Sequence, residues 1–321
     1  MSENWKERFF ELLLMDGNKF GDAVCLKSKN MPNKLYRYRP IAKKESFEWT
    51  TESIRNGTIH CSRKIDLNDP FEMSTSLSSM DFESYLADYP STKDVFRDFI
   101  SKSYVNIDVE EILNSENWIK EIKSLPCGDV VFSLLQQAIM PELERQINDY
   151  NRISELVKIA CFTEIPVNLP MWAHYADNHE GICLEYDVKG LHENLANMIF
   201  PVKYVDELLD IMKFVLAKNC IDQNQANVAT YMCIQKLNDW SYEKEWRYIF
   251  LPSMKKDYLE KFPLDYFDGG EEIPFGRPSK IILGKKICPD KQRKLHDIAS
   301  EFNIDIVKMK VTPYGFHEIN I

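Results

Sequence analysis

The sequence predicts an α+β protein with a mixed or antiparallel β core that carries a helical insertion. Strand-like and helix-like segments follow one another without the strict alternation of a doubly wound parallel sheet. Residues 80–157 instead keep apolar side chains at three-and-four spacing, with Gly128 as the only glycine. A length of 321 residues with 44% hydrophobic residues is sufficient for a substantial core.

The N-terminal part is divided by proline and glycine signals. A helix is expected at 3–15, and a polar stretch at 27–34 separates this N-terminal helical segment (1–34) from an α+β domain (35–321). A strand at 35–39 stops at Pro40, because proline cannot donate to a β ladder. The next expected elements are a helix at 44–55 with Phe47, Trp49 and Ile54 buried, a C-cap at Asn56-Gly57, and a strand at 58–62.

The insertion, about 80–157, is expected to hold four helices, including one at 130–140 and a long one from Pro141. The core then resumes. Further strands are expected at 158–163, 181–187, 245–251, 280–283, 304–310 and 316–319, and further helices at 168–176, 206–237 and 290–302.

Charge and composition exclude several classes of protein. The net charge of −10 argues against coating nucleic acid or anionic lipid by charge alone. No apolar run has the length of a membrane span, and the early apolar segment lacks a cleavage site. The eight cysteines lie at least thirteen residues apart, which favours reduced thiols in a cytoplasmic protein without a structural metal. The common nucleotide-cofactor and hydrolase motifs are absent.

The first candidate site segment is Leu35-Tyr36-Arg37-Tyr38-Arg39. On a strand Arg37 and Arg39 share one face, and Tyr36 and Tyr38 share the other. Two neighbouring guanidinium groups suit a phosphate or a carboxylate. The alternative is an edge strand whose charges lie in water.

The second segment, 240–248, combines carboxylates, arginine and aromatic rings. As a strand it places Glu243, Glu245 and Arg247 on one face and Tyr242, Lys244, Trp246 and Tyr248 on the other. The charged face needs water, ion-pair partners or a ligand. It is therefore either a Glu–Arg ladder or the wall of a cleft.

Three further groups complete the candidates. In the short helix at 168–176, Trp172 and Tyr175 lie one turn apart, and His174 is the best-placed histidine; its spacing to His179 does not suit a metal. Asn68 and Asp69 precede Pro70 in a turn. Glu185 lies near a strand end, from which it could reach a shared cleft.

Seven segments, taken together and in their order along the chain, resemble the bacterial domain of unknown function family 2971. They are LYRYRP, NGTIHCS, LNDPFE, ACFTE, MWAHYADNHEGICLEYD, YEKEWR and KIILG. The resemblance runs from Leu35 to the C-terminus, with 79–154 as a variable helical insert. The family carries no established reaction, so the resemblance implies the location of a site more than an activity.

A more distant resemblance is to the ADP-ribosyltransferases, including those that modify DNA bases. The similar pieces are the Leu35-Tyr36-Arg37 strand, the helix before Gly57, Ser62, and Glu243 or Glu245 beside Arg247. It implies an ADP-ribosyltransferase-like core and cleavage of NAD⁺ at the nicotinamide ribose. The implied roles are phosphate binding by Arg37 and Arg39, ribose positioning by Ser62 and Tyr38, action of Glu245 on the transition state, and a pocket lined by Trp172, His174 and Tyr175.

The resulting expectation is a cytoplasmic NAD⁺-using transferase or glycohydrolase, acting as a toxin or antiphage defence effector. Its partners would be a nucleotide ligand and a protein or nucleic-acid acceptor, with no membrane; the oligomeric state stays open. One alternative is a nuclease whose Asp69, Glu185, Glu243 and Glu245 gather magnesium. Another is a module that binds a ligand or partner without turnover.

Overall fold

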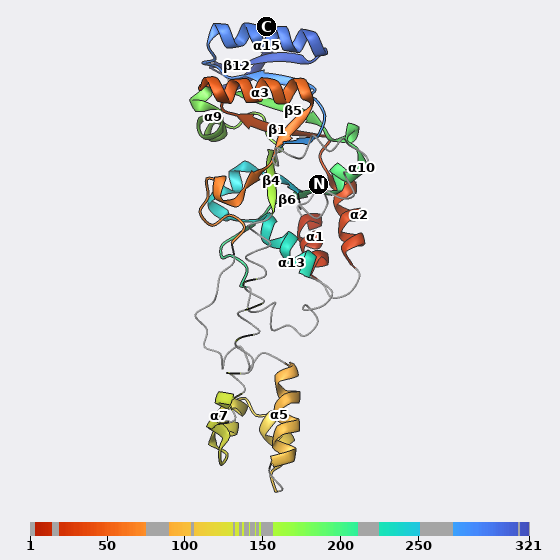
Figure 1. Ribbon diagram of the computed structural model, residues 1–321, viewed down its shortest axis with the longest axis vertical. Helices are drawn as coiled ribbons and strands as arrows, with labels where there is room; N and C mark the ends of the chain where they lie inside the picture. The colour runs from red at the N-terminus through yellow and green to blue at the C-terminus, as the bar shows by residue number, and fades with distance from the viewer. Residues whose placement is uncertain are drawn as a thin grey trace.

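The computed structural model describes residues 4–14, 19–74, 90–103, 106–130, 132–134, 157–210, 225–250, 272–313 and 315–320, with four single positions between 137 and 148. In this part of the chain the centre of the fold is a nine-stranded sheet with the order β13-β12-β11-β5-β1-β4-β9-β6, and β3 pairs with the end of β4 (Figure 1). Its strands are β1 Lys34–Arg39, β3 Ser62–Arg63, β4 Lys158–Thr163, β5 Ile182–Asp187, β6 Ile199–Pro201, β9 Glu245–Phe250, β11 Lys280–Leu283, β12 Asp305–Thr312 and β13 Gly315–Asn320.

The sheet is mixed. β11 and β12 are parallel and are joined through helix α15 (Pro289–Phe302), whereas the other strand pairs of this sheet are antiparallel. The predicted α+β class with a mixed or antiparallel core is therefore confirmed. Two small sheets flank it: β2 (Thr58–His60) pairs with β10 (Glu272–Pro274), and β7 (Lys203–Val205) pairs with β8 (Gln235–Leu237).

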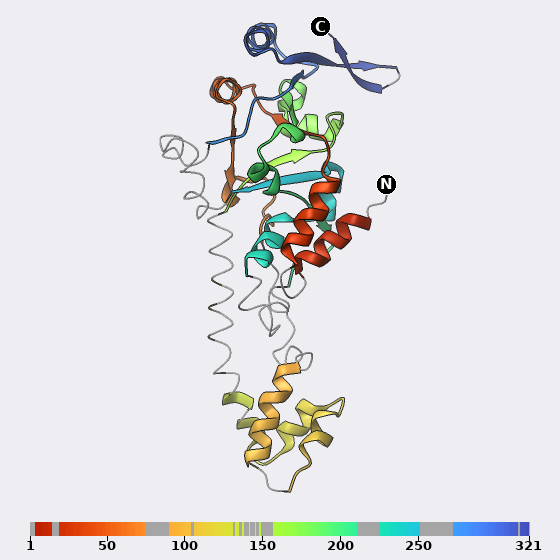
Figure 2. The same cartoon turned by 90° about the vertical axis from the view of Figure 1, so that its right-hand side faces the viewer.

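Helices α3 (Lys44–Asn56) and α15 cover one face of the sheet, side by side (Figure 2). Helix α3 ends where the sequence predicts, because Gly57 adopts a left-handed conformation with φ 65° and donates its N–H to Ile54 and Ser53 carbonyls. The predicted core residues Phe47 and Ile54 point from α3 into the cluster beneath. Trp49 was expected there too but is 67% exposed, because it lies on the outer side of the helix.

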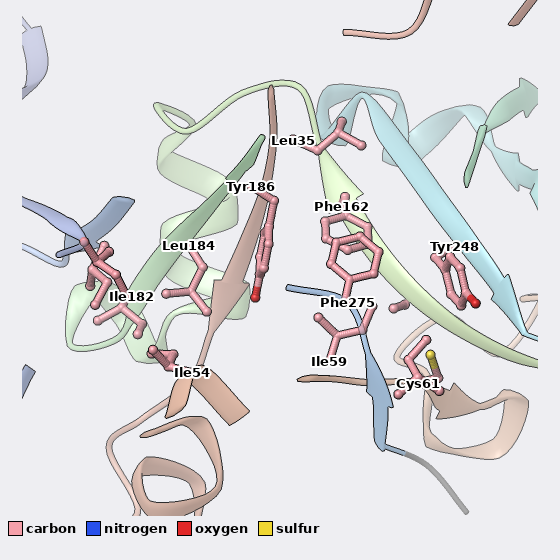
Figure 3. Packing of buried hydrophobic residues seen from close by; sticks show 14 of the residues in the cluster. Leu35, Ile54, Ile59, Cys61, Phe162, Ile182, Leu184, Tyr186, Tyr248 and Phe275 are labelled. Atoms are coloured by element: carbon pink, nitrogen blue, oxygen red, sulfur yellow. The ribbon is translucent and has the colours of Figure 1, made fainter. Parts of the chain in front are cut away.

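An aromatic group forms the centre of this core. Phe162 of β4 stacks on Phe275 with ring centroids 5.2 Å apart and meets Tyr186 edge-on at 5.7 Å (Figure 3). Such offset and edge-to-face pairs add to the free energy gained from burial alone. They pack β4, β5 and the segment after β10 together on the face that α3 and α15 cover.

The opposite face is covered by α9 (Leu169–Tyr175). Tyr38, Cys183 and Ile282 point to this side and pack with Met171 and Trp172, while alternate residues of the same strands point to the other core. A third cluster joins α1 (Asn4–Leu14) and α2 (Phe20–Asn30) to α13 (Gln225–Ile234). The predicted first helix is confirmed, but α2 was not predicted, because its C-terminal part falls in the polar stretch at 27–34, which predicts an interruption.

Part of the predicted insertion is helical, with its own apolar core. Helices α5 (Pro90–Ser103), α6 (Val109–Leu113) and α7 (Trp118–Ser124) pack around Phe96 and Trp118, far from the main sheet (Figures 1 and 2). The helices expected at 130–140 and from Pro141 lie largely outside the described residues. None of the helices in the described ranges has the length and apolar character needed to span a bilayer.

Three element predictions are wrong in detail. The strand at 58–62 is divided into β2 and β3 at Cys61, and each part pairs with a different partner. Within 206–237, the last three residues form β8 instead of a helix, and 211–224 lie outside the described residues. The interpretation of 240–248 as a strand is wrong for 240–243, which belong to a 3₁₀ helix (η4, Asn238–Glu243), whereas the strand expected at 245–251 does start at Glu245, as β9.

Two glycines allow backbone segments to touch. The Gly284 N–H donates to the Gly181 carbonyl at 2.9 Å, and a Cβ at Gly284 would lie 2.3 Å from the His179 carbonyl oxygen. Backbone atoms cannot yield as a flexible side chain does, so we expect Gly284→Ala to lower the free energy of unfolding by about 1–3 kcal/mol. Urea unfolding measures this loss. Gly190→Ala is the matched control, because nothing lies within 4 Å of the new methyl group; equal loss in both variants would contradict the explanation.

Candidate functional site

A cavity of about 370 Å³ opens where the main sheet separates between β1 and β4. The two strands share a single residue pair, Tyr36 with Thr163, whereas β1 pairs with β5 along its whole length. The start of β4 pairs with β3 instead, where Ser62 lies opposite Ile159. The cavity is lined by Tyr36, Arg37, Tyr38, Arg39, Pro40, Ser62, Asp66, Leu67, Asn68, Asp69, Glu72, Cys161, Phe162, Thr163, Met171, His174, Tyr175, Lys236, Glu243 and Glu245.

The two arginines of β1 differ in their environment. Arg37 is 7% exposed, donates to the His60 carbonyl at 2.5 Å and lies over the Phe162 ring. The Arg39 side chain makes no hydrogen bond or ion pair with any residue that the structure describes. Burial and the neighbouring Arg37 lower the pKa of Arg39 to about 10, so it remains a cation at neutral pH. Arg39 is therefore the guanidinium available to an anionic ligand.

A buried network of five charged side chains forms the acidic wall. The Lys236 ammonium lies 2.7 Å from a Glu243 oxygen and 3.1 Å from oxygens of Glu245 and Glu72. Arg247 contacts Glu245 at 2.9 Å and Glu72 at 2.6 Å. All five side chains are at most 6% exposed. Three carboxylates against two cations give the network a formal charge of −1 when every member is ionised.

The pKa values of the two predicted carboxylates, Glu243 and Glu245, are shifted in opposite directions. Burial disfavours the Glu245 carboxylate, but Arg247 and Lys236 outweigh burial and hold the pKa of Glu245 well below its usual range. Burial and the adjacent Glu245 charge raise the pKa of Glu243 above its ordinary value, against the effect of Lys236. A carboxylate pair whose pKa values are pushed apart is typical of acid–base sites.

A backbone turn brings Glu243 and Glu245 together. Lys244 between them adopts a left-handed conformation with φ 44°, at the junction of η4 and β9. The Thr163 hydroxyl donates to the Glu243 carbonyl at 2.5 Å, and the Tyr204 hydroxyl accepts the Glu245 N–H at 2.8 Å. The sequence-based reason for their proximity, strand alternation, is wrong, although both carboxylates do contact the same lysine.

Aromatic groups form the third wall, and α9 supplies two of them, His174 and Tyr175. The Tyr175 hydroxyl donates to Glu243 at 2.6 Å, and His174 lies 3.2 Å from the Tyr242 hydroxyl. Helix α9 starts at the Asn168 cap, whose side-chain oxygen accepts the Met171 N–H. The wall therefore presents one hydroxyl tied to the acidic network and ring surfaces on which a flat ligand could stack.

The register decides which faces the charged groups occupy. Glu245 lies opposite Thr163, and Thr163 lies opposite Tyr36, so these three residues share one face of the sheet. Arg37 and Arg39 belong to the other face. All of them reach one cavity because β1 and β4 separate beyond Tyr36.

Three predicted site residues do not line the cavity. Trp172 is fully buried and packs against Tyr38 and Phe316. Arg247 is also fully buried, beneath Glu245. Glu185 lies on β5 opposite Tyr36 and forms ion pairs with Lys34 and Lys280. It does not line the cavity that holds Glu243.

Sequence reasoning missed two members of the site. Glu72 belongs to the turn motif that contains Asn68 and Asp69, and a turn motif does not indicate the buried ion pairs that Glu72 makes with Lys236 and Arg247. Lys236 fell within an expected helix, whereas it lies on β8 beside the acidic pair. Asn68, Asp69, Ser62, Tyr36 and Tyr38 do line the cavity.

Comparison with known proteins gives one match. Residues 171–248 match the model of a family described as "Protein of unknown function (DUF2971)". This supports the resemblance to that family over a segment that holds His174, Tyr175, Lys236, Glu243 and Glu245, and does not include β1. No curated protein and no solved structure matches the chain.

Proposed function

We propose that the cavity binds NAD⁺ and that the protein cleaves it, as an ADP-ribosyltransferase-like enzyme or a glycohydrolase. The observation that carries the proposal is that Arg39, whose side chain has no hydrogen-bond or ion-pair partner among the described residues, and the Glu243–Glu245 pair line one cavity. Its volume of about 370 Å³ lies within the usual range for small-molecule sites. A ligand in which phosphate follows a ribose that carries a cationic ring, as in the nicotinamide half of NAD⁺, complements both walls.

The proposed reaction uses these charges directly. The bond between ribose C1′ and the nicotinamide nitrogen breaks, and its electron pair leaves with nicotinamide. The sugar becomes oxocarbenium-like, and the Glu245 carboxylate, whose pKa is lowered, stabilises this positive charge at neutral pH. A nucleophile, either water or an acceptor group on a macromolecule, forms the new bond to C1′ and loses a proton. Glu243, with its raised pKa, is suited to take up that proton.

The contacts around Lys236 weaken the magnesium nuclease alternative. The lysine ammonium already fills the space between Glu72, Glu243 and Glu245. Asp69 accepts the Phe71 N–H in its own turn, and Glu185 lies outside the cavity. In the described part of the chain, no three acidic, histidine or cysteine side chains are placed to share a metal ion.

The deciding experiment incubates the purified chain with NAD⁺, alone and with cell extract. Free nicotinamide with unlabelled macromolecules would identify a glycohydrolase, and a labelled protein or nucleic acid would identify a transferase. NAD⁺ binding without nicotinamide release would favour the non-enzymatic module. Magnesium-dependent cleavage of nucleic acid that is indifferent to NAD⁺ would overturn the proposal.

Arg39→Ala is expected to weaken NAD⁺ binding about 10- to 100-fold, because a charge-assisted hydrogen bond to phosphate is lost. Isothermal titration calorimetry measures the dissociation constant. The fold should persist, because Arg39 has no ion pair within the described residues. Arg293→Ala, an exposed arginine on α15 paired with Asp290, is the matched control. Equal affinity in both variants would remove Arg39 from the anion site.

A further inference from the structure

The loop at residues 67–74, here called the Asn68 loop, connects the cavity to the buried charge network. Asn68 and Asp69 line the cavity, and Glu72 lies three residues after Asp69 with its side chain buried. The Glu72 N–H donates to the Asp69 carbonyl at 3.1 Å, and the Phe71 N–H donates to the Asp69 carboxylate at 2.9 Å. These bonds hold Asp69, which lines the cavity, and Glu72, which contacts the charge network, in one compact turn.

The end of the loop is fixed to the strand that carries Lys236. The Gln235 side-chain amide donates to the Ser74 carbonyl at 2.9 Å, and Lys64 donates to the Met73 carbonyl at 3.1 Å. Met73 has a φ of 51° and is fully buried. These bonds hold Glu72 in place beside its two cations, so a displacement of the loop relative to β8 would change the distances from Glu72 to Lys236 and Arg247.

Glu72 acts on the cavity carboxylates through those cations. Its two oxygens contact Lys236 at 3.1 Å and Arg247 at 2.6 Å, while Lys236 also contacts Glu243 and Arg247 also contacts Glu245. The network holds three carboxylates and two cations, and Glu72 contributes one of the three negative charges. An excess negative charge in a buried site favours the protonated form of a neighbouring carboxyl group.

We infer that Glu72 is a positioning residue that couples the Asn68 loop to Glu243 and Glu245 through Lys236 and Arg247. A ligand that contacts Asn68 or Asp69 and shifts the loop then alters the charge around Glu243. This inference deepens the proposed function, and its meaning for catalysis rests on that function. The coupling itself can be measured without NAD⁺. The charged and titratable groups around the pair are Glu72, Lys236, Arg247, Tyr175, Tyr242, Tyr204 and Cys161.

The test follows the Glu243 carboxyl group by ¹³C NMR in glutamate-labelled protein, with its signal assigned from Glu243→Gln. Glu72→Gln keeps the shape of the side chain and removes its charge, so the Glu243 titration midpoint should fall by about one pH unit. Glu72→Asp keeps the charge and should leave the midpoint nearer to that of the parent protein. Glu301→Gln, an exposed carboxylate on α15, is the control that should leave it unchanged.

An unchanged Glu243 midpoint in folded Glu72→Gln would overturn the inference, since a purely structural glutamate would alter stability without moving this titration. If the variant unfolds at 25 °C, the titration is repeated in trimethylamine N-oxide, which favours compact states. Because no substrate is added, failure of the protein to cleave NAD⁺ leaves this result intact. Conversely, an unchanged midpoint in an active enzyme would overturn only the coupling.

Discussion

Arg247→Met is expected to lower the free energy of unfolding by about 3–5 kcal/mol, measured by urea denaturation at pH 7. The change leaves Glu245 without its main cation and Glu72 with Lys236 alone, both in a buried site. Removing one partner of a buried ion pair has this cost because the remaining charge has lost its hydration and its counter-ion. Methionine fills much of the same volume, so loss of packing contributes little.

Arg293→Met is the matched control, since this arginine is 77% exposed and its ion pair with Asp290 lies in solvent. An exposed ion pair contributes at most about 1 kcal/mol. If Arg247→Met were no more destabilising than Arg293→Met, the network would not stabilise the fold.

The pH dependence of the same variant tests the sign of the effect. The folded-state pKa of Glu245 lies below its unfolded value, so the carboxylate contributes stability above the unfolded pKa, about 4.3 for glutamate. That contribution disappears as the pH falls through the folded pKa. Arg247→Met should therefore lose less stability than the parent protein on acidification from pH 6 to pH 3, a difference that unfolding curves at each pH would reveal.

Glu245→Gln is expected to reduce the rate of nicotinamide release about 10²–10³-fold while NAD⁺ still binds. Loss of one preorganised charge at a developing transition-state charge has an effect of this size. The fold should persist, because the remaining Glu72 and Glu243 balance Lys236 and Arg247. Turnover is measured by chromatography of nicotinamide, and binding by calorimetry.

Glu301→Gln serves as the control, because it removes a carboxylate on the outer surface of α15. A Glu245→Gln enzyme with the turnover of this control would remove Glu245 from its proposed role. If Glu245→Gln lost binding as well as turnover, the carboxylate would be required to form the site, not to stabilise a transition state.

Some features of the site were predictable because they depend on neighbours in the chain. The alternation of Arg37 and Arg39 with Tyr36 and Tyr38 follows from strand geometry, and β1 places them as predicted. The end of α3 follows from the conformational freedom of Gly57. The pattern at 168–176 likewise predicted the short helix that brings His174 and Tyr175 to the cavity.

Other features could not be read from neighbouring residues. Trp172 was expected to line the pocket, but helix α9 turns it toward Tyr38 and Phe316. Trp49 was expected to be buried, but it lies on the outer side of α3. Arg37 and Arg39 are equivalent by alternation, yet of the two only Arg37 finds an acceptor within the described part of the chain, the His60 carbonyl of another strand. Their different roles depend on partners distant in sequence.

The sequence alone determined the α+β class, the positions of most strands along the chain and the segments that carry the cavity's charged and aromatic groups, since hydrophobic period and turn residues are local properties. Only the tertiary structure decided that β1 and β4 separate beyond one residue pair, and that Glu72 and Lys236 join two glutamates from a different part of the chain. The physical reason is that charge pairing in a buried site depends on distance in space, and neither periodicity nor motif spacing encodes which distant side chains will supply the counter-ions.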